Sequence, residues 1–293
     1  MKIEKENFLA PIHEYTNYPY RELCRKYGAK YTLVPLVSAM GLVSSKKYIE
    51  NVDYFNTKNE GIQLFGSDAR IIGKASEILI KEFSGLEWID INCGCPSRNV
   101  TASGGGTELL KNPKLVKEIV KEVKKTGVKV SVKMRLCNTK EKTFDFIKEI
   151  EPDFLIVHGR TKEQMYSGTA NWEYIKEIKK NTKLKIVGNG DIQNQIEAKE
   201  KIKDKFCDAI MIGRAAMSNP GCFSNMEINK ENKIKFLREY LQIIEEKQYY
   251  EKITITRVKA LNLLKGFENS SDVRKTISLS KNVHEIEKML EKI

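Results

Sequence analysis

The chain has 293 residues, 41% hydrophobic and 31% charged, which suits one large domain with an apolar core and excludes a disordered composition. With 51 Lys and Arg against 39 Asp and Glu, the formal net charge is +12, which fits either a polyanionic partner such as nucleic acid or solvated lysine-rich helices. No run of about twenty apolar residues occurs, and the first apolar stretch (residues 8–11) is too short for a signal peptide, so we expect a cytoplasmic protein without a membrane segment.

Eight short apolar runs recur along the first three quarters of the chain. They occupy residues 8–11, 31–35, 61–65, 88–92, 128–134, 154–158, 185–189 and 209–213. The runs are continuous, as in strands that are buried on both faces. Charged stretches of helical period, such as residues 113–125 and 172–180, separate most of them. This alternation predicts an α/β fold, a (β/α)8 TIM barrel; a doubly wound sheet is the alternative, but the glycine fingerprint after its first strand is absent.

The pattern changes after about residue 225. Helical periods follow at residues 233–249, 253–264, 271–278 and 284–292, with a turn expected at residues 266–270. We therefore predict two domains, a TIM barrel over residues 1–224 and a small all-α domain over residues 225–293.

Polar residues at the ends of the predicted strands are the candidates for a barrel active site, which forms at the carboxyl ends of the strands. Lys133 interrupts an apolar strand, where an amine is costly unless it meets an anion or reaches water along its own stem. Gln63 and His158 also stand near strand ends, and for them a satisfied core amide and a structural histidine remain the alternatives.

Glycine-rich turns follow the seventh and eighth predicted strands. Gly190 lies between Asn189 and Asp191, and Gly213 precedes Arg214. Backbone N–H groups at such a turn, where a helix begins, can bind phosphate without obstruction by side chains. The two turns predict a phosphate-bearing cofactor; the alternative is that the glycines only close tight turns.

The six cysteines show no repeating spacing. Cys95 stands between Gly94 and Pro96 just after a predicted strand, which indicates an exposed thiol on a constrained turn, whereas Cys93 fits a buried and inert position. The Cys93–Cys95 pair lacks the second pair of ligands that a zinc site needs, so no metal site is expected.

At these residues the sequence resembles the tRNA-dihydrouridine synthase family, in a prokaryotic form. The matching segments run in order through nearly the whole chain, at residues 9–11, 63–68, 90–96, 132–135, 157–161, 188–191 and 211–215. The Asn-x-Gly-Cys-Pro element that begins at Asn92 and the His-Gly-Arg-Thr element that begins at His158 are the most specific.

The resemblance implies reduction of a specific uridine in tRNA to 5,6-dihydrouridine, with FMN as cofactor and NADPH or NADH as reductant. The sequence leaves the oligomeric state open, with a monomer as the expectation. Cys95 would be the general acid that protonates uracil C5, and Asn92 and Arg160 would contact the substrate. The helical domain would help to hold tRNA. The residues expected around FMN are Pro11, Ile12, His13, Gln63, Lys133, His158, Asn189, Gly190, Asp191, Gly213 and Arg214.

The chain departs from the family pattern in two places. Residues 12–14 read Ile-His-Glu where the family usually has Met-Ala-Gly, so His13 replaces an alanine beside the expected flavin. In the helical tail, Lys259 replaces a family histidine and residues 262–263 replace an aromatic pair, whereas Arg274 matches.

Three other functions are compatible with parts of the sequence. A flavin barrel acting on a free pyrimidine, like dihydropyrimidine or dihydroorotate dehydrogenases, would have no use for a basic helical tail. A non-catalytic RNA-binding barrel would have no reason to keep Cys95, Lys133 and His158 together. A barrel for pyridoxal phosphate or a sugar phosphate would explain the phosphate turns and nothing else.

Overall fold

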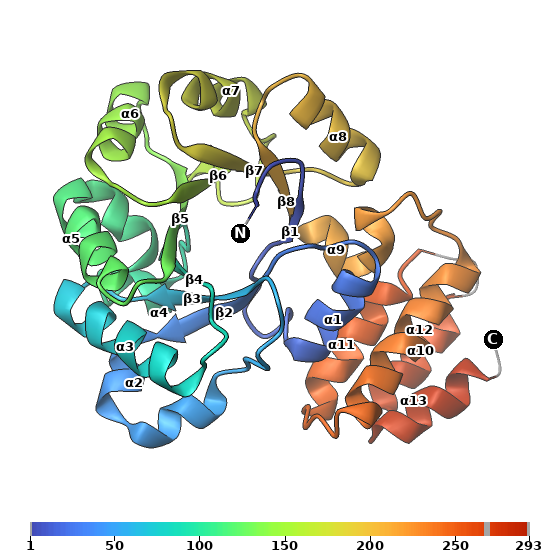
Figure 1. The fold of residues 1–293 in the computed structure, drawn as a ribbon. Helices are drawn as coiled ribbons and strands as arrows, with labels where there is room; N and C mark the ends of the chain where they lie inside the picture. The colour runs from blue at the N-terminus through green and yellow to red at the C-terminus, as the bar shows by residue number, and fades with distance from the viewer. Residues whose placement is uncertain (1, 267–269, 292–293) are drawn as a thin grey trace.

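A closed ring of eight parallel strands forms the centre of the computed structural model, which describes residues 2–266 and 270–291 (Figure 1). The strands are β1 (Asn7–Leu9), β2 (Thr32–Ser38), β3 (Glu60–Phe65), β4 (Trp88–Cys93), β5 (Lys129–Leu136), β6 (Phe154–Thr161), β7 (Lys185–Asn189) and β8 (Ala209–Ile212). They pair in the order β1-β8-β7-β6-β5-β4-β3-β2, and a parallel bridge between Phe8 and Tyr31 joins the two ends. The predicted TIM barrel is confirmed.

Helices surround the barrel on its outer face (Figure 1). They are α1 (Tyr18–Lys26), α2 (Ala39–Ser44), α3 (Ala69–Glu82), α4 (Arg98–Thr101), α5 (Pro113–Lys124), α6 (Lys140–Glu149), α7 (Trp172–Asn181), α8 (Gln195–Lys203) and α9 (Arg214–Ser218). Helix α5 shows why the sequence forms them. Asn112 caps the N–H of Leu115, Pro113 occupies the first turn, and buried apolar residues recur at helical spacing toward the strands.

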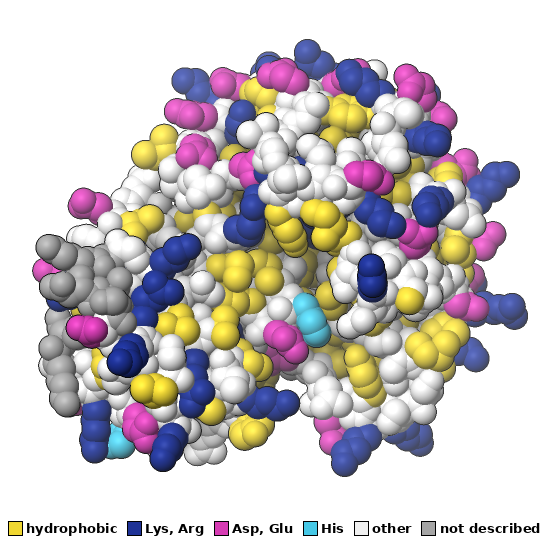
Figure 2. Space-filling view, turned by 180° about the vertical axis from the view of Figure 1, so that it is seen from behind, with side chains coloured by type: hydrophobic (Ala, Val, Ile, Leu, Met, Phe, Trp, Pro, Cys, Tyr) yellow, Lys and Arg dark blue, Asp and Glu magenta, His cyan; other side chains and the backbone are white. Residues whose placement is uncertain are grey.

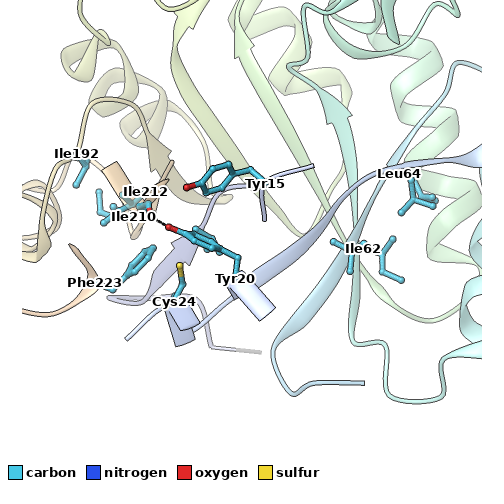
Figure 3. Packing of buried hydrophobic residues seen from close by; sticks show 14 of the residues in the cluster. Tyr15, Tyr20, Cys24, Ile62, Leu64, Ile192, Ile210, Ile212 and Phe223 are labelled. Carbon is cyan, nitrogen blue, oxygen red and sulfur yellow. Dashed lines mark hydrogen bonds between the residues drawn. The ribbon is translucent and has the colours of Figure 1, made fainter. Parts of the chain in front are cut away.

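The chain ends in four helices that pack beside the barrel: α10 (Lys230–Glu246), α11 (Ile253–Leu263), α12 (Ser270–Leu279) and α13 (Val283–Leu290). They contact the barrel through α1 and α9 (Figure 1). Tyr20 of α1 donates a hydrogen bond to the carbonyl of Ala216 at 2.8 Å, and its ring lies beside Tyr15 and near Phe223 (Figure 3). Residues 267–269 of the expected turn lie outside the described residues. No helix among the described residues is both long and apolar enough to span a membrane.

The interior of the barrel is layered along its axis, because alternate residues of each strand point inward. Aromatic side chains fill the amino end, where the rings of Trp88 and Phe154 have centroids 5.3 Å apart. Gly61 leaves the space for this tryptophan, since an added Cβ would lie 2.3 Å from the indole. Two residues further along, the inward positions become polar, with Gln63 on β3 and Asp90 on β4. The barrel interior therefore has an apolar layer at its amino end and a polar layer next to it, toward the carboxyl ends of the strands.

The observed strand ends differ slightly from the predicted ones. Strand β1 ends at Leu9, so Pro11 lies in the following loop, and Gly213 follows β8. Strand β6 continues to Thr161, because its ladder with β5 resumes after an irregularity at Arg135, and so both His158 and Arg160 lie within the strand.

Candidate active site

A cavity of about 550 Å³ opens at the carboxyl ends of the strands. The face opposite to that of Figure 1 is hollowed near its centre, with hydrophobic side chains around the hollow and Lys and Arg side chains spread beyond it (Figure 2). Every residue predicted for the site lines this cavity, except Arg160. The fold thus brings together side chains that are scattered from Pro11 to Arg214 in the sequence.

Three amide and carboxyl side chains form a row in the polar layer. Gln63 Nε2 donates to Asp90 Oδ2 at 2.7 Å, and Asn92 Nδ2 donates to Gln63 Oε1 at 2.8 Å. The hydroxyl of Ser131 donates to the other oxygen of Asp90. All four side chains are buried, and Gln63 and Asn92 also reach the cavity wall. Burial raises the pKa of Asp90, and its hydrogen bonds and the charge of Lys133 oppose that rise.

The turn that carries Cys95 is held on both sides. Asn92 Oδ1 accepts the backbone N–H of Cys95 at 2.9 Å, and the N–H of Thr107 donates to the carbonyl of Cys95 at 3.0 Å. Gly106 has φ +60°, and an added Cβ there would lie 2.3 Å from that same carbonyl oxygen, so this position requires glycine. The Cys95 thiol is half-buried in the cavity wall, whereas Cys93 is fully buried and burial raises its pKa well above the usual value.

Lys133 reaches the cavity from the middle of β5. Burial lowers the pKa of its amine, and the carboxylate of Asp90 opposes that effect. Among the described residues, Lys133 Nζ makes no hydrogen bond or ion pair with another side chain. A half-buried ammonium without such a partner is suited to a bound anion.

His158 is neutral. Burial, followed by the charges of Lys133 and Arg135, lowers the pKa of its imidazole to about 2. Arg160 NH1 lies 3.4 Å from His158 Nε2, and because a guanidinium can only donate, Nε2 is the acceptor and the ring proton belongs on Nδ1.

Arg160 lies behind the cavity wall instead of in it. Its guanidinium donates to the carbonyls of Ser167 (3.2 Å) and Gly168 (2.6 Å) and to Asp191 Oδ2 (2.8 Å). Burial would raise the pKa of Asp191, but the N–H of Ala170, Arg160 and Arg214 together lower it. The Asp191 carboxylate therefore accepts hydrogen bonds from two arginines and from the backbone of Ala170. A ligand at this turn would contact backbone groups and not this carboxylate.

The two predicted phosphate turns differ from each other. Gly190 has φ +132°, and an added Cβ would lie 2.5 Å from Ala170 Cβ, so glycine is required there. At Gly213 an added Cβ would make only an ordinary contact, 3.4 Å from Ala10 Cβ. Helix α9 begins directly after Gly213, whereas α8 begins only at Gln195, because Asn194 is its cap.

Arg135, Tyr166 and Asp90 are among the residues in or near the cavity that were not predicted for the site. Arg135 and Arg214 lie 5.5 and 5.2 Å from the ring centroid of Tyr166, an exposed aromatic residue in the cavity wall. Nothing in the local sequence marks Tyr166. Asp90 carries the same signal as Lys133, a charge inside an apolar strand, and could have been found by it.

The fold is a TIM barrel, and the cavity lies at the carboxyl ends of its strands, where enzymes of this fold have their active sites. Residues 8–293 match the family model described as dihydrouridine synthase (Dus), and the chain belongs to this family of oxidoreductases.

Known relatives agree over most of the chain. "Probable tRNA-dihydrouridine synthase" of Aquifex aeolicus (strain VF5) is 32% identical over 98% of this chain and 95% of its own length. "tRNA-dihydrouridine synthase B" of Pasteurella multocida (strain Pm70) is 34% identical over 77% of this chain and 70% of its own. The solved structure of histamine dehydrogenase from Rhizobium sp. 4-9 has a TM-score of 0.59 at 12% identity over 83% of this chain, which shows the fold alone; the chain spans 50% of that structure's length.

Proposed function

We propose that this chain reduces a uridine of tRNA to 5,6-dihydrouridine, with FMN bound in the cavity and NADPH or NADH as the source of electrons. Family membership and the names of the relatives support this reaction. The observation that carries it is the pairing, in one cavity, of a half-buried thiol on a fixed turn with a lysine ammonium that makes no hydrogen bond or ion pair with another side chain of the described residues. The thiol can supply a proton, and the lysine can face a negatively charged ring.

The donor set of the cavity fits a flavin mononucleotide. The isoalloxazine ring would lie against Gln63, Lys133 and His158, with residues 11–13 at its edge. The phosphate would be held by the backbone of residues 189–191 and 213–214, where Gly190 has no Cβ, and by the guanidinium of Arg214, which also pairs with Asp191. A neutral His158, with its ring proton on Nδ1, can donate a hydrogen bond there without repelling Lys133.

When bound, reduced FMN supplies the hydride that uracil C6 receives. The thiol of Cys95 donates its proton to C5, so the C5=C6 double bond is lost and the base gains two hydrogens. The resulting thiolate takes a proton from solvent. Lys133 offsets the negative charge of the reduced ring, and Asn92 orients the base. The buried target base of a folded tRNA must leave its stack to reach this cavity.

The formal charge of +12 suits tRNA as the partner. We propose that residues 1–224 form the catalytic domain and residues 225–293 a helical domain that contacts tRNA. The helices α10 to α13 lie on one side of the barrel, where they extend the surface that a large substrate can contact (Figure 1).

The test is nucleoside mass spectrometry on unmodified tRNA after incubation with the purified protein, FMN and NADPH or NADH. A gain of two hydrogens on one uridine is the expected result. If the protein binds flavin and tRNA but leaves every uridine unchanged, the proposal is wrong. Parallel incubations with free uracil and with dihydroorotate test the free-pyrimidine alternative.

A further inference from the structure

The row formed by Asp90, Gln63 and Asn92 has a fixed hydrogen-bond polarity, because both of its ends are fixed. At the cavity end, one side-chain atom of Asn92 lies 3.2 Å from the N–H of Gly94 and 2.9 Å from the N–H of Cys95. An atom that faces two backbone donors must be the amide oxygen. The other atom, Nδ2, therefore faces Gln63.

The orientation of the Asn92 amide determines that of the Gln63 amide. Because Asn92 presents Nδ2, the atom of Gln63 at 2.8 Å from it must be the acceptor Oε1. This turns Gln63 Nε2 toward Asp90, whose carboxyl oxygen accepts it at 2.7 Å. Ser131 occupies the second oxygen of Asp90. Asp90 and the two backbone amides thus require the same orientation of both side-chain amides.

After its hydrogen bonds within the protein, the side chain of Asn92 has one N–H group left for a ligand. Its oxygen has two lone pairs and accepts two N–H groups, while its nitrogen has two hydrogens and gives one to Gln63. One N–H remains, on a side chain that lines the cavity and is 6% exposed. Asn92 can therefore donate one hydrogen bond into the cavity and can accept none.

We propose that Asp90 is a positioning residue that, through Gln63, presents Asn92 to the substrate as a donor only, and that this donor selects the C4 carbonyl of uracil. The proposal rests on the proposed function. A base whose C5 faces the Cys95 thiol has its C4 substituent on the adjacent ring atom, and Asn92 is bonded to the backbone of that same cysteine. Uracil offers a carbonyl oxygen at this position, whereas cytosine offers an amino group that would meet the N–H of Asn92 donor to donor.

The test reverses the direction of the hydrogen bonds that join Asp90, Gln63 and Asn92. Asn92→Asp replaces the donor by an acceptor and leaves Gln63 between two carboxylates, so we expect the thermal midpoint of the purified holoenzyme to fall by about 5 °C. Asp90→Asn can keep the original polarity, because the new amide can accept from Gln63 and donate to the hydroxyl of Ser131; we expect its thermal midpoint to fall less than that of Asn92→Asp.

The double variant Asp90→Asn with Asn92→Asp allows Gln63 to turn around, so that every partner in the row is again matched. We expect its thermal midpoint to return to near the wild-type value, while its rate of uridine reduction stays about a hundredfold low. Stability would then recover without activity, which a merely structural role does not predict. A double variant whose stability loss is the sum of the two single losses overturns the fixed row, and one that reduces uridine at the wild-type rate overturns the donor role.

A matched control is available at the opposite end of the barrel. Asn7 Nδ2 donates to Gln195 Oε1 at 2.7 Å, the same kind of bond that joins Asn92 to Gln63, but Asn7 stands at the start of β1. Asn7→Asp should lower stability and leave the rate of uridine reduction unchanged. If the wild-type protein itself forms no dihydrouridine, the proposed function fails, while the stability cycle still decides whether the row exists.

Discussion

Lys259 Nζ lies 2.6 Å from Glu251 Oε1, and the pair is buried, with side-chain exposures of 0% and 3%. Glu251 also accepts hydrogen bonds from Asn17 at 2.6 Å and from the hydroxyl of Tyr240 at 2.7 Å. Asn17 caps α1 of the barrel, Tyr240 belongs to α10 and Lys259 to α11. Glu251 and Lys259 thus form a polar cluster between the barrel and the terminal helices.

Replacing this lysine should destabilise the protein strongly. Lys259→Met leaves the buried carboxylate of Glu251 without its cation, and we expect a loss of about 3–5 kcal/mol in the free energy of unfolding. The measurement is urea unfolding. The double variant Lys259→Met with Glu251→Gln should recover much of the loss, and Lys235→Met, an exposed lysine on α10, is the control. Equal stabilities of the single variant and the control would contradict the role of the ion pair.

Removing the thiol of Cys95 should separate cofactor binding from chemistry. Cys95→Ala keeps the wall that faces the proposed flavin but lacks the proton donor, so flavin content should stay at the wild-type level while dihydrouridine formation falls at least about a hundredfold. Cys93→Ala is the matched control, because Cys93 is fully buried outside the cavity wall. Full activity of Cys95→Ala would rule out the acid role.

The charge of Lys133 should matter more for the reduced flavin than for the oxidised one. Lys133→Met removes the cation that would face the proposed flavin ring, so we expect FMN to bind at least about tenfold more weakly and the midpoint potential of the bound flavin to fall. Fluorescence titration and spectroscopic reduction measure the two effects. Lys129→Met, on an exposed residue at the start of the same strand, should change neither. An unchanged potential in Lys133→Met would refute the assignment.

The neutral His158 should make the cofactor-free protein sensitive to acid. Burial first, and then the nearby cations, lower the pKa of the folded imidazole to about 2, so between this value and the unfolded pKa the unfolded state binds more protons. Stability is therefore lost as the pH falls below the unfolded pKa. From pH 7 to 5 the wild type should lose about 2 kcal/mol more than His158→Asn.

Urea unfolding at both pH values measures this difference. His284→Asn, which changes an exposed histidine on α13, is the control. The same loss in the wild type and in His158→Asn would mean that the buried imidazole is already charged.

A second groove, of about 440 Å³, should contribute to tRNA binding. It lies between the barrel and the segment that joins α10 to α11, and it shares His13 and Leu36 with the active-site cavity. Tyr250 in its wall is 85% exposed and can stack on a base next to the target. Tyr250→Ala should raise the KM for tRNA about tenfold and leave the flavin spectrum unchanged.

The control for the groove is Ile196→Ala, which alters an exposed apolar side chain of α8 outside it. If both variants have the wild-type KM for tRNA, Tyr250 does not contact the substrate.

Much of the site followed from local sequence. Continuous apolar runs separated by amphipathic stretches are a property of neighbouring residues, so they predict the barrel without knowledge of any long-range contact. Because every strand of such a barrel points its carboxyl end to the same face, residues at strand ends are expected to converge. Gln63, Asn92, Cys95, Lys133 and His158 all meet that expectation.

The partners of those residues were decided by the tertiary structure alone. The pairing of β3 with β4 sets Gln63 beside Asp90, and the loop after β7 brings Asp191 to Arg160, which turns that arginine away from the cavity. Nothing in the local sequence indicates that Lys259 is buried, but the packing of the terminal helices against α1 and α9 buries it beside Glu251. A hydrogen bond or ion pair between distant residues depends on register and packing, which no local pattern records.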